Sequence, residues 1–229
     1  MQMSSLITGT AAAADRDRLW RRARLLGMLT VGYNIIEGVV SVVFGASDEA
    51  LALFGFGLDS FIETISAIGV LVMILRVQSG GEQRRSRFET TALRITGWCF
   101  MVLALALVTG SVLSVATGSA PETALPGIVI STLSILSMLW LVRAKRQVGR
   151  ALDSAAIVAD AQCNAVCVYM SVVLLISSGL FALTGFAFFD ALGAAGLAWF
   201  SVREGRESLE KARTGQIGCA CTSHDACSR

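Results

Sequence analysis

Long apolar stretches alternate with short polar segments along most of the 229-residue chain. Six of these stretches come near or exceed the roughly 20 residues with which a helix crosses a hydrocarbon core of about 30 Å. They cover residues 25–46, 50–75, 95–117, 124–142, 154–184 and 187–202. Hydrophobic residues make up 54% of the chain and charged residues only 16%, which is more apolar than a soluble domain requires. The pattern predicts an all-α membrane protein with six transmembrane helices.

Basic residues lie on one side of the predicted helices. The 19 Lys and Arg residues fall in the N-terminal segment, in the connector around Arg84, in "RAKRQVGR" (143–150), or after Val202. The three opposite connectors, "GASDEA", "GSAPET" and "TGF", contain none. Because cytoplasmic loops are enriched in Lys and Arg, we expect both termini to be cytoplasmic and the protein to be multi-pass in the cytoplasmic membrane. The net charge of +2 follows from this asymmetry and gives no support to a nucleic-acid partner.

Little of the chain lies outside the predicted helices. We expect a cytoplasmic N-terminal segment at 1–23, a transmembrane domain at 24–210 and a cytoplasmic tail at 211–229. The first 14 residues lack a basic cluster followed by an apolar core, so we expect no cleaved signal peptide. The chain has one His, in the tail, and no Ser–His or His–Glu pairing within the predicted helices. We therefore do not expect an enzyme.

Acidic residues interrupt the apolar stretches, and such residues usually mark an ion or substrate path. They are Glu37, Asp59, Glu63, Asp160 and Asp190. Asp59 and Glu63, four residues apart in "GLDSFIE", share one helical face with Cβ atoms about 6 Å apart. No Lys or Arg lies within the six apolar stretches, so this pair requires a cation between its members or at least one proton. Asn34 and Glu37 fit a transport role and hydrogen bonding to neighbouring helices equally well.

Thiols form a second pair in the fifth stretch. In "VADAQCNAVCVYM" (158–170), Cys163 and Cys167 are four residues apart, with Asp160 on a nearby helical row. Their sulfur atoms can approach to about 4 Å, which suits two metal–sulfur bonds of about 2.3 Å to one ion. Together with the acid pair they would form a four-ligand pocket, although core packing explains the two cysteines equally well. Cys99 stands alone in the third stretch, and we expect it to pack in the core.

Four more metal-binding side chains lie in the tail: Cys219, Cys221, His224 and Cys227. Their spacing, C-x-C-x2-H-x2-C, offers three thiols and one imidazole, and cytoplasmic thiols stay reduced. The tail is therefore either a binding segment for a soft metal ion or inert.

These residues resemble the membrane half of the cation diffusion facilitator family of divalent-metal transporters. The resemblance covers roughly residues 25–210 and is carried by Asn34 with Glu37, "GLDSFIE", "IVADAQCNAVC" and "FDALGA". It implies that the paired positions of the second and fifth helices bind the transported ion. Those positions are Asp59, Glu63, Cys163 and Cys167, and Asp160 and Asp190 match further acids expected as secondary metal residues.

The sequence departs from the family where the fifth helix usually has His and Asp, because Cys163 and Cys167 stand there. Thiolates favour soft ions, so the expected cargo is cadmium, mercury, lead or zinc, with no resident cofactor. The resemblance also implies alternating access, exchange of metal for protons, and export. Where the family has a cytoplasmic dimerising domain, this sequence has the short tail. Small residues in "ALGAAGLAW" allow close helix packing, either within the chain or in a homodimer.

Two alternatives to export use the same residues. A membrane-embedded sensor or carrier would bind the metal without moving it across the bilayer. An importer would hand the ion to the cytoplasmic thiols of the tail.

Overall fold

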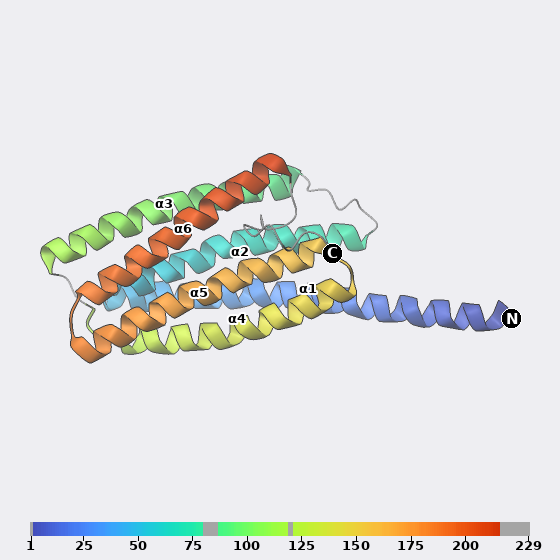
Figure 1. Cartoon of the computed structure of the whole chain (residues 1–229), viewed down its shortest axis with the longest axis horizontal. Coiled ribbons are helices and arrows are strands. Elements are labelled where there is room, and N and C mark those ends of the chain that lie inside the picture. The colour runs from blue at the N-terminus through green and yellow to red at the C-terminus, as the bar shows by residue number, and fades with distance from the viewer. Residues whose placement is uncertain (1, 80–86, 119–120, 216–229) are drawn as a thin grey trace, which may run out of the picture.

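The computed structural model describes residues 2–79, 87–118 and 121–215, and all six expected helices are present in these ranges (Figure 1). They are α1 (Gln2–Ser47), α2 (Leu51–Gln78), α3 (Arg87–Thr117), α4 (Leu125–Ala151), α5 (Ala155–Thr184) and α6 (Phe188–Thr214). The prediction of an all-α membrane protein is confirmed. Each helix covers one of the six apolar stretches, because a chain in the bilayer must satisfy its backbone hydrogen bonds within the segment.

Several helices continue past their apolar stretches. Helix α1 begins at Gln2 and is continuous through the expected N-terminal segment, and α6 runs to Thr214. The segment 143–150, expected as a connector, forms the last two turns of α4. That expectation was therefore wrong, and its basic residues belong to a helix of the bundle.

Within the described residues, five helices are long and apolar enough to cross a membrane, namely α1 to α5. The sixth, α6, has a shorter apolar stretch that contains Asp190 and is followed by charged residues from Arg203 onward. The charged half of α6 lies at the same end of the molecule as the start of α1 (Figure 1). We call this the basic end, because α2, α4 and α6 also finish there with Arg76, Arg150 and Arg213 in their last turns.

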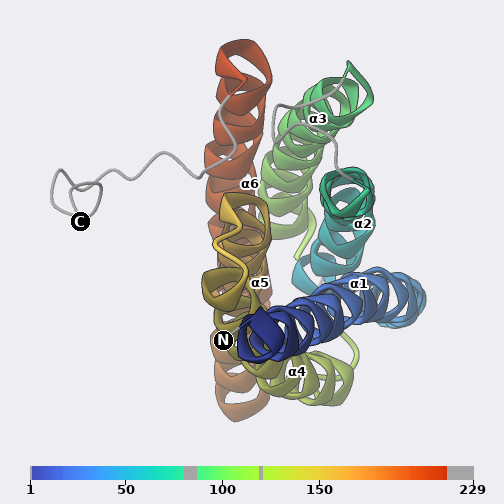
Figure 2. The ribbon, with the colours of Figure 1, turned by 90° about the vertical axis from the view of Figure 1, so that its right-hand side faces the viewer.

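The helices form three layers of two. Seen along the bundle, α3 and α6 make one outer layer, α2 and α5 the middle layer, and α1 and α4 the other outer layer (Figure 2). The most extensive contacts join α1 to α2, α3 to α6 and α4 to α5. Helices α2 and α5 also contact each other at the centre. The two helices with paired metal-binding residues are therefore neighbours in the interior.

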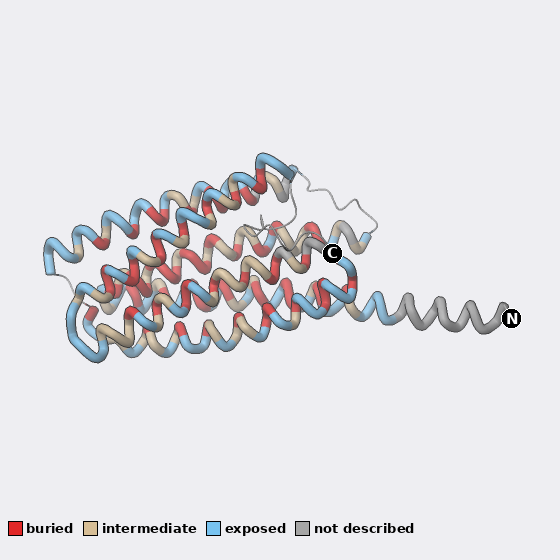
Figure 3. The backbone as a smooth tube through the Cα atoms, viewed as in Figure 1, coloured by how far each residue is buried: buried red, intermediate tan, exposed pale blue. Residues whose placement is uncertain are grey.

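Apolar packing divides along the bundle into two clusters. One includes Phe56, Leu107 and Leu174, and the other, nearer the basic end, includes Ile74 and Met138. Along each helix, buried positions lie on the side that faces the interior of the bundle, and exposed positions lie on the outer side (Figure 3). Many exposed positions are large and apolar, as expected for surfaces that face lipid.

Helices α3 and α6 approach each other closely at Gly97 and Gly205. A Cβ atom on either glycine would lie 3.0 Å from the backbone oxygen of the other. Such small residues let helix backbones touch in a membrane. This contact fixes the segment of α6 that carries Glu204, the residue directly before Gly205.

Candidate metal centre

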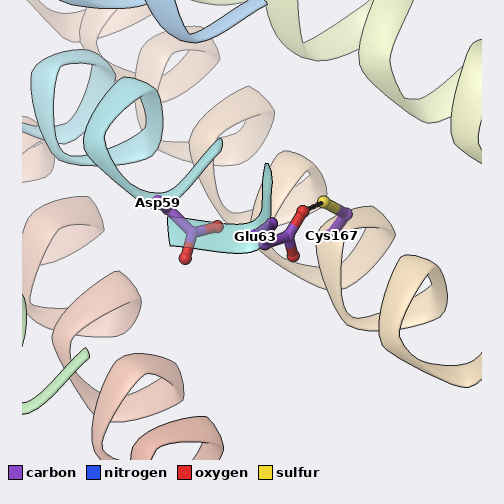
Figure 4. Close-up of side chains that lie close together, drawn as sticks. All are labelled: Asp59, Glu63 and Cys167. Carbon is purple, nitrogen blue, oxygen red and sulfur yellow. Dashed lines mark hydrogen bonds between the residues drawn. The ribbon is translucent and has the colours of Figure 1, made fainter. Parts of the chain in front are cut away.

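The acid pair of α2 and one thiol of α5 meet at the centre of the bundle. Asp59, Glu63 and Cys167 each offer one ligand atom, and these atoms all lie within 4.8 Å of one another. The Cys167 thiol donates a hydrogen bond to the Glu63 carboxylate, one turn along α2 from Asp59 (Figure 4). Asp59 and Cys167 are each only 1% exposed, whereas Glu63 is partly exposed. We call these three residues the central cluster.

The central cluster has little internal charge compensation. Within the described residues, neither carboxylate oxygen of Asp59 has a hydrogen-bond partner. Glu63 accepts a second hydrogen bond, of 3.4 Å, from the Asn34 side-chain nitrogen. A buried carboxylate without a partner is costly, and a bound cation would offset that cost.

The spacing of the central cluster suits one metal ion after a small contraction. Ligand atoms around a tetrahedral ion lie about 3.3–3.8 Å apart when the bonds are about 2.0–2.3 Å long. A set of three atoms within 4.8 Å therefore has to close by only about 1 Å. Two carboxylates and a thiol can bind a borderline or soft divalent ion.

Cys163 does not belong to this cluster of described residues, in contrast to the expected four-ligand pocket. Helices α2 and α5 run in opposite directions (Figure 1), and a step of four residues is a rise of about 6 Å. Cys163 therefore lies one turn closer to the basic end than Cys167, while Asp59 lies one turn farther from it than Glu63. The outer members of the two pairs thus diverge.

Cys163 instead lines a cavity of about 40 Å³, which we call the inner cavity. Most of the residues that line it are polar, and the full set is Thr30, Asn34, Glu63, Ser66, Ala67, Leu93, Phe100, Asp160, Cys163, Asn164, Glu204, Ser208 and Lys211. A water molecule needs roughly 10–15 Å³ by this measure, so the inner cavity has room for an ion with a few waters. Glu63 is both on its wall and in the central cluster. The inner cavity therefore lies on the basic-end side of the cluster.

Asp160, expected as a secondary metal residue, forms an ion pair with Lys145. The Lys145 nitrogen lies 2.7 Å from an Asp160 oxygen and donates a hydrogen bond of 3.1 Å to the Asn164 side-chain oxygen. Lys145 is 1% exposed and Asp160 is 4% exposed. A cation thus already compensates Asp160, and its role as a metal residue stays a prediction.

Sequence reasoning missed Lys145 because it assigned residues 143–150 to a connector. A signal was available in the helical spacing. Leu141, Lys145, Val148 and Leu152 recur at intervals of four, three and four, and all four are buried. Lys145 therefore occupies a core position of α4.

Asp190, the other expected secondary residue, binds backbone at the far end of the bundle. Its two carboxylate oxygens accept hydrogen bonds from the backbone nitrogens of Leu51 (2.9 Å) and Ala52 (3.2 Å). These nitrogens belong to the first turn of α2, which lacks intrahelical acceptors. Asp190 therefore caps α2 from the start of α6, away from the central cluster, and its role as a metal residue stays a prediction.

Glu37 connects two helices by hydrogen bonds. Its carboxylate accepts a bond from Tyr33 on α1 and another from Ser60 on α2, both 3.1 Å long. These contacts favour the helix-bonding interpretation of Glu37. Cys99 is partly buried against the apolar cluster of α2, α3, α5 and α6, which agrees with core packing. The tail residues Cys219, Cys221, His224 and Cys227 lie outside the described residues.

The six-helix bundle as a whole is similar to a known protein family. Residues 27–214 match the family model of the cation efflux transmembrane domain. A search of curated proteins finds no match. The matched range contains the central cluster, the inner cavity and all six helices apart from the first part of α1.

Proposed function

The chain belongs to the cation efflux family and is a multi-pass membrane transporter of divalent cations, and from this premise we propose that its cargo is a soft, thiol-seeking ion. Cadmium, mercury, lead and zinc are the candidates. The proposal includes export across the cytoplasmic membrane by alternating access, in exchange for protons.

One observation supports the choice of cargo: among the described residues, the Asp59 carboxylate is buried without a hydrogen-bond partner beside the Glu63–Cys167 contact. The two carboxylates balance the charge of a divalent ion. The thiol adds a soft ligand, which discriminates against magnesium, calcium and manganese. A protein built only to pack its core would not leave a carboxylate in this position uncompensated.

The exchange of metal for protons follows from the ligand chemistry. The Cys167 thiol must release its proton in order to bind a metal ion through sulfur. A proton held by the carboxylate pair must leave as well, because a cation and a proton compete for the same oxygens. After the ion departs on the opposite side, the emptied site takes up protons there and carries them back. Binding should therefore weaken as pH falls.

The direction of transport is supported by the position of the inner cavity. It lies on the basic-end side of the central cluster, and Lys and Arg are enriched on the cytoplasmic side of membrane proteins. A cytoplasmic ion would reach Glu63 through the inner cavity and then bind Asp59 and Cys167 behind it.

The test is uptake of cadmium, zinc and cobalt into vesicles that contain the purified protein, with a pH-sensitive dye inside. We expect cadmium flux coupled to proton movement in the opposite direction. Asp59→Asn keeps the side-chain size but removes the charge, and should lower flux at least tenfold, or about 1.4 kcal/mol. Glu210→Gln, at an exposed position of α6, is the matched control and should transport normally.

Two results would overturn parts of this proposal. Cadmium binding without flux in the native protein would favour a sensor or carrier. Normal flux through a folded Asp59→Asn protein would move the transport site away from the central cluster.

A further inference from the structure

We propose that the inner cavity is a second cation site, in which Asn34, Cys163 and Glu204 bind the ion together with Glu63 before it reaches the central cluster. We call it the loading site. It rests on the proposed function for the nature of the ion, a soft divalent cation. Its distinct feature is a ligand from α6, a helix that contributes nothing to the central cluster.

Asn34 provides the first indication of a ligand. It is 1% exposed and lies on the wall of the inner cavity. Its side-chain nitrogen donates to Glu63, but its side-chain oxygen has no hydrogen-bond partner within the described residues. A buried amide oxygen normally has a partner, and a carbonyl oxygen is a good ligand for a cation.

Glu204 adds a carboxylate from α6 to the wall of the inner cavity. It is partly buried on α6, next to the close contact of Gly205 with α3. In the described part of the chain, no hydrogen bond or ion pair engages its carboxylate. The nearby Lys211 pairs with Glu207 at 2.8 Å, so the positive charge on this wall is already compensated.

The balance of charge around the inner cavity favours a divalent cation. Asp160 is neutralised by Lys145, and Lys211 by Glu207. Within the part of the chain that the structure describes, the wall carboxylates of Glu63 and Glu204 have no ion pair, and Cys163 adds a thiol. The inner cavity therefore offers two carboxylates and one thiol, the same types of ligand as the central cluster. This second set lies about one turn closer to the basic end.

Glu63 belongs to both the loading site and the central cluster, which suggests how the ion passes from one to the other. Glu63 lines the inner cavity and also contacts Cys167. An ion at the loading site could exchange Cys163 for Cys167, and Glu204 for Asp59, while Glu63 remains bound. The volume of about 40 Å³ allows a few waters to complete the coordination sphere.

The test measures cadmium binding to the full chain in detergent, with the tail ligands replaced in every sample. The replacements are Cys219→Ser, Cys221→Ser, Cys227→Ser and His224→Ala. The central cluster is then removed by Asp59→Asn with Cys167→Ser. We expect this protein to keep one cadmium site of lower affinity, seen by equilibrium dialysis and by the ultraviolet absorption of a cadmium–thiolate bond.

Further substitutions in the same background assign the remaining site. Glu204→Gln should weaken the residual binding at least tenfold, or about 1.4 kcal/mol, and Cys163→Ser should remove the cadmium–thiolate absorption. Glu210→Gln should change neither. Circular dichroism and thermal unfolding confirm that each variant is folded.

The outcomes separate this proposal from the proposed function. Loss of all cadmium binding on removing the central cluster, or residual binding that ignores Glu204→Gln, would overturn the loading site and leave the transporter intact. Flux of cadmium into vesicles is a second measurement. Glu204→Gln alone should raise the KM for cadmium at least tenfold, or about 1.4 kcal/mol, with little change in the maximal rate. Normal flux after removal of the central cluster would instead contradict the proposed function.

Discussion

The Lys145–Asp160 pair and the central cluster both place carboxylate charge in the interior of the bundle, but they differ in what compensates that charge. Each includes a residue of α5. At the first, a lysine of the neighbouring helix lies 2.7 Å from the acid. At the second, Asp59 has no partner among the described residues. The comparison teaches that a buried acid alone does not indicate a metal site, and that the candidate is the acid left with neither a cation nor a hydrogen-bond donor among the described residues.

The largest expected effect on stability comes from breaking the Lys145–Asp160 ion pair. Lys145→Met leaves Asp160 as an unpaired buried charge and should lower the free energy of unfolding by about 3–5 kcal/mol. Denaturation of the purified protein in detergent measures this change. Arg146→Met, at an exposed neighbouring position of α4, should change stability by less than about 0.5 kcal/mol.

A double substitution decides whether the ion pair is the cause. Lys145→Met combined with Asp160→Leu removes both charges and should recover most of the lost stability. A double variant as unstable as Lys145→Met alone would mean that Lys145 stabilises α4 by packing its aliphatic chain.

The second expected effect is on the metal preference of the central cluster. Cys167→Asp replaces the soft donor of the central cluster and should lower the ratio of cadmium to zinc flux at least tenfold, or about 1.4 kcal/mol. Cys163→His alters only the inner cavity and should shift this ratio less. Flux in vesicles of matched protein content measures both. An unchanged ranking in the Cys167 variant would mean that Cys167 packs the core and does not bind metal.

A smaller effect is expected on the stability of the unliganded central cluster. Asp59→Asn breaks no ion pair and no hydrogen bond of the described residues, so the free energy of unfolding without metal should fall by less than about 1 kcal/mol. The same denaturation measurement, made with a chelator present, tests this. A loss as large as that of Lys145→Met would assign Asp59 a structural role and erase the contrast between the two regions.

The smallest effect should come from the tail. Truncation after Gly218 removes its three cysteines and one histidine but leaves both buried regions intact. Maximal flux should stay within about threefold of the full chain, a difference of less than about 0.7 kcal/mol, while the apparent affinity for metal changes. If a well-folded truncated protein carries no ion at all, the tail belongs to the transport path.

The helices and the acid pair could be predicted from the sequence because each is encoded locally. A long apolar stretch specifies a membrane helix without reference to its neighbours. A spacing of four residues likewise places Asp59 and Glu63 on one face wherever the helix packs. Cys167 was also expected in the site, from its position on the fifth helix and from the family resemblance.

The errors concern relations between helices, which local patterns do not encode. The spacing of Cys163 and Cys167 gives their common face but not the offset of α5 against α2, and that offset separates Cys163 from Asp59. The positive charge of Lys145 suggested a surface connector, whereas its partner Asp160 lies on another helix. Glu204 was overlooked because it follows the apolar part of α6, and only the packing of α6 on α3 brings it to the inner cavity.

The cap that Asp190 places on α2 has a mechanical consequence. Its two hydrogen bonds join the first turn of α6 to the first turn of α2 at the end of the bundle opposite the basic end. Glu63 and Glu204 lie farther along these same two helices, and both line the inner cavity. Because these two bonds hold the ends of α2 and α6 together, a small rotation of α6 about Asp190 would move Glu204 farther than it moves the first turns. Under the proposed loading site, such a rotation would release the ion without unwinding either helix.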